Sequence, residues 1–175
     1  MMVENLPEYN WEIIFVDDGS SDNSVEFMME LCRQDKNCSV VELSRNFGKE
    51  IALSAGVDYA FGDLVICMDA DLQHPPNQIP DMLSYWEEGY EVVEMVRSHS
   101  EREPWLRRTG STIFYFILKL ISSTEILAKT TDFRLLDRKV VQSLRQVEER
   151  QRMFRGIVDW LGFRKIRLNF IAPPR

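Results

Sequence analysis

Short apolar, β-branched segments alternate with helix-like segments along the first hundred residues, and this alternation constrains the fold more than any other feature. The predicted strands cover residues 11–16, 39–43, 63–69 and 91–96. The predicted helices cover residues 23–34, 48–61 and 78–88. Continuous apolar strands suit a sheet that helices cover on both faces. The sequence therefore predicts an α/β fold with a Rossmann-like, doubly wound, mostly parallel sheet.

The second half of the chain is less regular. Its predicted elements are a long amphipathic helix at 105–122, a short strand or loop at 131–137, helices at 139–147 and 153–161, and a last strand at 166–171. The whole chain has 175 residues, of which 45% are hydrophobic, so a single domain with a real core is expected.

Charge and cysteine content exclude several classes. A net charge of −7 argues against a general nucleic-acid binder, which needs a basic surface. Three cysteines without a CxxC pair fit buried free thiols in a reducing compartment, so a soluble, cytoplasmic chain is expected. His74 and His99 are too few and too scattered for a zinc site.

The most apolar run, Ile113–Ile121, is about half of the ~20 residues that span a bilayer, and Lys119 interrupts it. No membrane span is therefore predicted, and no signal peptide opens the chain. The run has two interpretations: a core helix, or a helix lying at the membrane surface beside a lipid substrate.

Two carboxylates, Asp69 and Asp71, follow the third predicted strand, with Gln73 next in the same alternation. Residues i and i+2 of a strand point to the same side, so these side chains are expected to converge. Open α/β sheets bind ligands at the carboxyl ends of their strands, and oxygen ligands there suit Mg²⁺ or Mn²⁺ holding a diphosphate. The alternative is a solvated acidic turn that caps the next helix.

Two further strands also end in polar turns. Asp17 and Asp18 open one turn, where they could hydrogen-bond a nucleobase and ribose, and Arg45 and Lys49 lie in the other. Either turn alone could be an ordinary connection between a strand and a helix. Together with Asp69 they predict a ligand site along one edge of the sheet.

Five segments together resemble the family 2 glycosyltransferases of GT-A fold. The closer likeness is to the branch that acts on polyprenyl phosphates, the bactoprenol glucosyltransferases and dolichol-phosphate mannose synthases. The segments are EIIFVDDGSSD (12–22), LSRNFGKEIALSAGVDYAFGD (43–63), VICMDADLQHPP (65–76), TDFRLLDRKVV (131–141) and RMFRGIVDWLGF (152–163). They cover most of the chain in the family's order.

The resemblance implies an inverting glycosyltransferase that uses Mg or Mn to move a sugar from a nucleotide-sugar donor, UDP-glucose or similar, to a polyisoprenyl phosphate. It implies a donor-binding half at 1–97 and an acceptor-binding half at 98–175. The implied donor-binding residues are Asp17, Asp18, Ser20, Asp22, Arg45, Lys49 and Asp69. The implied metal ligands are Asp69, Asp71 and Gln73, and the implied catalytic residues are Asp132 and Arg134.

An acceptor phosphate needs cations, and arginine forks suit it best. The candidates are Arg97, Arg107, Arg108, Arg134 and Arg175, although any one of them could instead form a surface ion pair. Asp132 could orient the nucleophile, or act as a base if the acceptor were a hydroxyl.

The chain departs from the family pattern at several points. The family's first, usually central strand is missing, and the transmembrane helices of longer members are absent, so a partial GT-A domain is expected. Exposed strand edges invite pairing with another chain, so a homo-oligomer is one expectation. His74 stands where an acid is common, and Thr131 stands where glycine is common.

Three other functions remain open from the sequence. A sugar nucleotidyltransferase shares the architecture but would need a basic, glycine-rich loop near the N-terminus. A phosphatase would need partners of the DxD motif that do not follow. A truncated paralogue without turnover would bind nucleotide or a partner subunit. The sequence leaves open the sugar, UDP against GDP, the acceptor and the oligomeric state.

Overall fold

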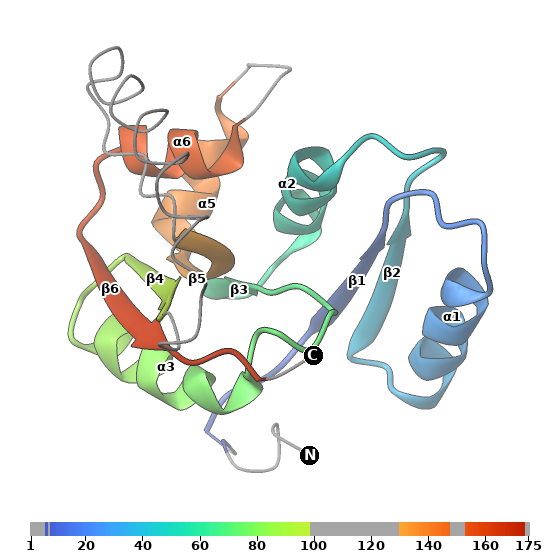
Figure 1. Ribbon diagram of the computed structural model, residues 1–175, viewed down its shortest axis with the longest axis horizontal. Coiled ribbons are helices and arrows are strands. Elements are labelled where there is room, and N and C mark those ends of the chain that lie inside the picture. Colours follow the sequence, from blue (N-terminus) through green and yellow to red (C-terminus); the bar gives the residue numbers. More distant parts are fainter. Residues whose placement is uncertain (1–5, 7, 99–129, 148–152, 174–175) are drawn as a thin grey trace, which may run out of the picture. The chain divides into compact units, whose positions relative to one another are not determined.

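The computed structural model describes residues 6, 8–98, 130–147 and 153–173. The chain divides into two compact units. The first unit comprises Met1–Val65 and Leu136–Ile157, and the second comprises Ile66–Leu135 and Val158–Arg175. Strands and helices alternate through the first hundred residues (Figure 1).

The first unit is built on a pair of parallel strands. Strand β1 (Ile13–Asp17) pairs with β2 (Cys38–Glu42), and Asp17 lies opposite Glu42 at the end of the register. Helix α1 (Ser24–Gln34) packs on β2, and α2 (Lys49–Tyr59) packs on β1. This arrangement brings the turns that follow β1 and β2 to the same end of the pair, because parallel strands end together.

Helix α5 (Arg138–Arg145) packs on α2, and its arginine side chains hydrogen-bond to carbonyl oxygens at the C-terminal end of α2. One Nη of Arg145 donates to the carbonyl oxygens of Val57, Asp58 and Ala60 at 2.7–2.9 Å, and Arg138 Nη1 donates to Ala60 O at 2.9 Å. Guanidinium groups at a helix C-terminus satisfy its unpaired carbonyls and oppose its negative dipole. These contacts join two segments that lie far apart in the sequence.

A four-stranded sheet in the order β3-β5-β4-β6 forms the core of the second unit. Its strands are β3 (Leu64–Cys67), β4 (Val92–Arg97), β5 (Thr130–Asp137) and β6 (Lys165–Phe170). Strands β4 and β6 are parallel, with Arg97 opposite Phe170. The short 3-10 helix η2 (Pro76–Gln78) leads into α3 (Ile79–Glu87), which packs on β4. The division between the two units falls within the sequences of β3, β5 and helix α6 (Phe154–Trp160).

Most predicted elements are confirmed, with ends shifted by one to a few residues. The uncertain segment at 131–137 is a strand, whereas the helix expected at 105–122 lies outside the described residues. The third strand is shorter than predicted and ends at Cys67, not at Asp69. The predicted boundary between a donor half and an acceptor half, at 97/98, falls inside the second unit.

The strands form two sheets, where the sequence predicted one. The described residues ahead of β1, 6 and 8–12, contain no strand.

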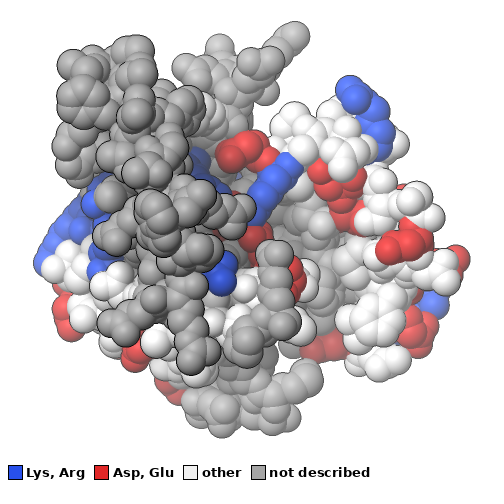
Figure 2. Space-filling view, viewed as in Figure 1, with Lys and Arg blue, Asp and Glu red and all other residues white. Residues whose placement is uncertain are grey.

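Surface charge and helix length bear on possible partners. On the face shown in Figure 2, acidic and basic side chains of the described residues are interspersed. Within the described part of the chain, no helix combines the length and the apolar character needed to cross a bilayer.

Candidate active site

The turn after β1 is held together by Asp17. Its Oδ2 accepts the backbone N–H groups of Gly19 and Ser20, both at 2.9 Å, and the side chain is buried. The hydrogen bonds from Ser20, the largest influence, lower the pKa of Asp17 below its usual 3.8. Asp17 is therefore an ionised group whose oxygens shape the turn.

Asp18 ties this turn to the turn after β2. Its two carboxylate oxygens accept the backbone N–H groups of Phe47 at 2.7 Å and Gly48 at 2.9 Å. Exposed Arg45 lies in the same turn, with its guanidinium carbon 4.3 Å from the centre of the Phe47 ring. The first unit thus brings Asp17, Asp18, Ser20, Arg45 and Lys49 into two joined turns. Asp22 lies further on, where its Oδ1 accepts the N–H of Ser24 at the start of α1.

The close approach of the two turns depends on Gly19. Its φ is +72°, and a Cβ there would lie 2.5 Å from the Arg45 carbonyl carbon and 2.6 Å from the Asn46 nitrogen. Gly19→Ala is expected to lower the free energy of unfolding by about 1–3 kcal/mol. Gly156→Ala is the control, because its Cβ would meet only Met153 Cβ at an ordinary 3.5 Å. Denaturant unfolding of both variants checks this, and equal effects would contradict it.

Asp17 also predicts a pH dependence of stability. Because its folded pKa is lower than its unfolded value of 3.8, its stabilisation is present above that pH and is lost as the pH falls through the folded pKa. Asp17→Asn should therefore be less stable than the unaltered chain at pH 7, and the gap should narrow below about pH 4. Unfolding free energies at pH 7 and pH 3 measure the gap. A gap of the same size at both values would contradict this assignment.

In the second unit, Asp69 and Asp71 lie in the loop after β3. Asp69 is half-buried, with 29% of its side chain exposed, and Asp71 is exposed. Asp71 Oδ1 accepts the N–H of Gln73 at 3.0 Å, and Leu72 between them has a φ of +62°. The strand alternation used to predict convergence does not apply here, because the strand has already ended at Cys67. The loop's own hydrogen bonds place the carboxylates instead.

Gln73 is buried and links this loop to two other segments. Its Nε2 donates to the carbonyl oxygen of Pro173 at 3.1 Å, and its Oε1 accepts from Arg97 Nη2 at 3.3 Å. Both polar atoms of the side chain thus have protein partners, so its predicted place as a metal ligand would require it to exchange one of them. In the structure, Gln73 holds Arg97 beside the loop of Asp69 and Asp71.

Asp132 and Arg134 of β5 are both buried, at 1% and 0% exposed. Arg134 Nη1 lies 3.8 Å from Glu94 Oε1 on the neighbouring strand β4, and Glu94 Oε2 accepts from Arg167 Nε on β6 at 3.1 Å. Arg134 Nη2 also donates to Thr131 O at 3.2 Å. We call Arg134, Glu94 and Arg167 the cross-strand triad. Arg134, predicted to face a phosphate, therefore lies inside the sheet packing.

Sequence reasoning missed Glu94 and Arg167. The available signal was a glutamate within the apolar strand at 91–96, where an unpartnered charge would be costly. Beside the triad, burial raises the pKa of the Cys67 thiol to about 12, with Asp132 and Asp69 adding to the rise and Arg134 opposing it. Cys67 is therefore a protonated, unreactive thiol at neutral pH.

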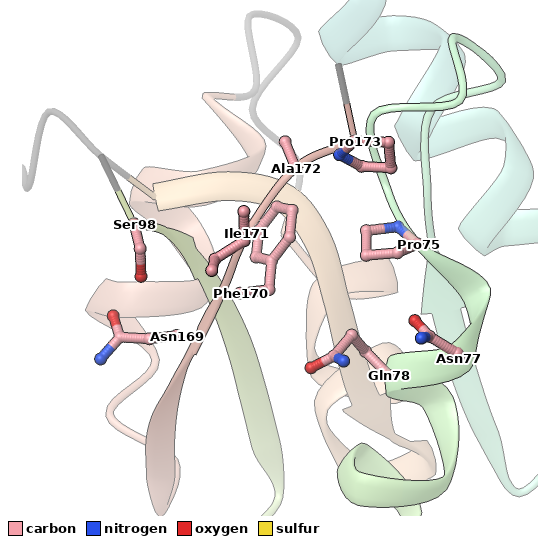
Figure 3. A pocket seen from close by; sticks show the side chains of 9 residues that line it. All are labelled: Pro75, Asn77, Gln78, Ser98, Asn169, Phe170, Ile171, Ala172 and Pro173. Carbon is pink, nitrogen blue, oxygen red and sulfur yellow. The ribbon is translucent and has the colours of Figure 1, made fainter. Parts of the chain in front are cut away.

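An open pocket of about 620 Å³ is lined by Pro75 and Ser98, which lie close in sequence to Gln73 and Arg97, and by Pro173, whose carbonyl accepts from Gln73. Figure 3 shows Asn77 and Gln78 on one side of it and Ser98 and Asn169 on the other. Phe170, Ile171 and two prolines supply apolar surface, and none of the described residues that line the pocket is charged. The pocket thus suits an uncharged group that offers both hydroxyl and apolar surface.

The fit of a divalent metal to these residues rests on Asp69 and Asp71. Among the described residues, no group of three or more His, Cys, Asp or Glu side chains could hold a metal ion. Mg²⁺ and Mn²⁺ are commonly held by one or two carboxylates together with substrate phosphates. Two accessible carboxylates therefore fit a metal that arrives with a diphosphate, and they do not form a complete protein cage. Of the other predicted residues, Arg107, Arg108 and Arg175 lie outside the described residues.

Known proteins resemble this chain in sequence and in fold. It is 42% identical over 94% of its length to an uncharacterized glycosyltransferase of Synechocystis, and 37% identical over 91% to the bactoprenol glucosyl transferase of Shigella phage SfV. It spans 52% of each of these relatives. The structure also resembles a mannosyltransferase from Pyrobaculum calidifontis, solved with GDP-Man and Mn²⁺. The TM-score is 0.58 at 17% identity, over 99% of this chain and 53% of that one.

The solved mannosyltransferase shows that the fold is GT-A, which confirms the predicted fold class. The family model described as "Glycosyl transferase family 2" matches residues 2–145, which is most of the chain. The match includes the turn of Asp17 and Asp18, the loop of Asp69 and Asp71, and Asp132 and Arg134. The chain belongs to glycosyltransferase family 2.

Proposed function

We propose that this chain is the catalytic part of an inverting glycosyltransferase that moves a sugar from a nucleotide-sugar donor to a polyisoprenyl phosphate at the cytoplasmic face of a membrane. UDP-glucose is the donor we favour, because relatives at 37% identity are named bactoprenol glucosyl transferases. The observation that carries the proposal is the link through Gln73 between the loop of Asp69 and Asp71 and the exposed cation Arg97. This link supports a single site in which Asp69 and Asp71 serve the donor diphosphate and Arg97 serves the acceptor phosphate.

The first unit is assigned to the nucleoside part of the donor. Asp17 and Asp18 accept four backbone N–H bonds that hold the two turns together, and Ser20 lies exposed on the turn after β1 and Arg45 on the turn after β2. A rigid turn loses little conformational entropy when a ligand binds, which favours affinity. Asp22 and Lys49 are assigned to the donor as well, on the resemblance alone.

The second unit is assigned to the donor diphosphate and the acceptor. Asp69 and Asp71 would hold Mg²⁺ or Mn²⁺, which would neutralise charge on the departing nucleoside diphosphate. Arg97 is exposed and can attract the acceptor phosphate. Among the residues that the structure describes, those lining the pocket beside Ser98 carry no charge, so the pocket suits an uncharged part of the acceptor.

The chemistry needs little help from a base. A phosphate monoester has a second pKa of about 6, so its oxygen is already anionic near neutral pH. That oxygen bonds to the anomeric carbon while the bond to the donor diphosphate breaks and the diphosphate leaves with the electron pair. Asp132 is assigned to orient the reacting groups. We assign Arg134 to support β5 from within the cross-strand triad and give the phosphate to Arg97, with Arg107, Arg108 and Arg175 as further candidates.

A transfer assay tests the proposal. The chain is incubated with radiolabelled UDP-glucose or GDP-mannose, undecaprenyl phosphate in detergent and Mn²⁺, and label in the lipid phase is counted. We expect label from one donor, and its loss with EDTA. Arg97→Ala should reduce transfer by raising the KM for the lipid, whereas Arg33→Ala, which removes an exposed arginine of α1, should not.

A second candidate is a paralogue that binds nucleotide or a partner subunit without turnover, which the existing protein partners of the predicted metal ligand Gln73 favour. Metal-dependent donor binding with no labelled lipid at any donor would support it. A sugar nucleotidyltransferase is no longer favoured, because the family match covers residues 2–145.

A further inference from the structure

His74 reaches back five residues to the first of the two loop carboxylates. Its Nδ1 accepts the backbone N–H of Asp69 at 2.8 Å, and its side chain is 5% exposed. Strand β3 ends at Cys67, so Asp69 lies where a ladder hydrogen bond no longer fixes the backbone. The imidazole supplies the acceptor for that N–H.

The second ring nitrogen also faces Asp69. Nε2 lies 3.9 Å from Asp69 Oδ2. A neutral imidazole has one acceptor nitrogen and one N–H, so the ring that accepts at Nδ1 carries its proton at Nε2. Nε2 is too far from Oδ2 for a direct hydrogen bond, but both ring nitrogens lie near Asp69, Nδ1 at its backbone N–H and Nε2 near its carboxylate.

Two aromatic side chains fix the ring itself. It stacks on Phe133 of β5, with ring centres 5.2 Å apart and planes at 17°, and it meets the edge of Phe170 of β6 at 6.2 Å. Phe133 and Phe170 are buried and pack edge to face on each other at 5.9 Å. The ring thus has one orientation, set by residues of two strands of the sheet.

We infer that His74 is a positioning residue that sets the place and direction of Asp69, so that the loop presents its metal-binding carboxylate already oriented. The inference rests on the proposed function for the role of Asp69 and on the hydrogen bond and ring contacts for the role of His74. Side chains that hydrogen-bond to a metal ligand without touching the metal typically contribute about 10–100-fold to metal affinity. We expect a similar contribution from His74 to Mn²⁺ affinity in the presence of UDP.

Two substitutions separate the acceptor atom from the aromatic ring. His74→Asn keeps an acceptor, Oδ1, at the position of Nδ1 but loses the ring. His74→Phe keeps a ring that can stack on Phe133 but has no acceptor. Mn²⁺ binding with UDP is measured by electron paramagnetic resonance, the protection of the Asp69 amide by hydrogen exchange, and the thermal midpoint by calorimetry.

We expect His74→Phe to lose protection at the Asp69 amide and to bind Mn²⁺ about 10–100-fold more weakly. His74→Asn should keep protection and bind Mn²⁺ within roughly 3-fold of the unaltered chain, even where its thermal midpoint is the lower of the two. His74→Asn should therefore bind Mn²⁺ more tightly than His74→Phe because it keeps the hydrogen-bond acceptor, whichever of the two variants is the more stable.

The outcomes separate the inference from the proposed function. Native Asp69 protection and native Mn²⁺ affinity in His74→Phe would overturn the inference alone. The inference would also be overturned if the more thermally stable of the two variants bound Mn²⁺ more tightly, regardless of which one keeps the hydrogen-bond acceptor. If the unaltered chain bound no Mn²⁺ with UDP, the proposed function would fail together with the metal part of the inference, whereas Asp69 exchange would still report whether His74 holds the loop.

Discussion

Asp71→Ala is expected to abolish the Mn²⁺-dependent part of nucleotide-sugar binding. Only two accessible carboxylates, Asp69 and Asp71, are available to the metal in this loop, and the diphosphate must complete the coordination. Loss of a direct ligand should reduce metal affinity by more than the roughly 10–100-fold that follows loss of a residue that only orients a ligand. Calorimetric titration of the donor with and without Mn²⁺ measures the effect.

Two control variants make this result specific. Asp71→Asn keeps an oxygen that can accept the Gln73 N–H, now 3.0 Å from Asp71 Oδ1, but removes the charge. It should lose the metal as Asp71→Ala does. Asp81→Ala removes an exposed carboxylate at the start of α3 and should bind normally. Normal Mn²⁺ dependence in Asp71→Asn would show that Asp71 shapes the loop and does not hold the metal.

Glu94→Ala is expected to give the largest loss of stability, about 3–5 kcal/mol of unfolding free energy. Glu94 is 1% exposed and lies between Arg134, which is 0% exposed, and Arg167. Removing it leaves the buried guanidinium of Arg134 without this carboxylate, whereas Arg167, with 34% of its side chain exposed, stays in contact with solvent. Denaturant unfolding followed by circular dichroism measures the loss.

Two comparisons isolate the charge effect at Glu94. Glu30→Ala removes the glutamate of an exposed pair with Arg33 and should cost less than about 1 kcal/mol. Replacing the whole cross-strand triad by apolar residues, Glu94→Met with Arg134→Met and Arg167→Leu, should recover most of the stability, because the buried charge of Arg134 is then removed together with that of Glu94. If the triple variant were as unstable as Glu94→Ala, packing and not charge would explain the loss.

Sequence patterns predicted the local elements well because those elements depend on local chemistry. The apolar runs at 11–16 and 91–96 are strands, and the polar turns that follow β1 and β3 carry Asp17, Asp18, Asp69 and Asp71 as expected. The end of β3 was placed two residues too late. Apolar residues continue to Met68, and the local sequence pattern does not indicate that the Asp69 N–H donates to the His74 side chain instead of to a neighbouring strand.

The partners of the candidate residues could not be predicted, since they come from distant segments. Gln73 meets Arg97 and Pro173, which lie 24 and 100 residues further on, and Arg134 meets Glu94 on the neighbouring strand. A spacing rule identifies a glutamine or arginine in a motif but does not show which of its atoms already have partners. The roles predicted for Gln73 and Arg134 therefore stay predictions, and the packing favours supporting roles for both.

The most direct test is calorimetric titration of the chain with UDP-glucose and with GDP-mannose, each with and without Mn²⁺. The account predicts that one donor binds, that binding requires Mn²⁺, and that Asp71→Asn removes the requirement together with the binding. The preferred donor identifies the nucleotide. Binding of neither donor, or binding of equal strength with and without Mn²⁺, would contradict the claim that Asp69 and Asp71 form a metal-dependent donor site.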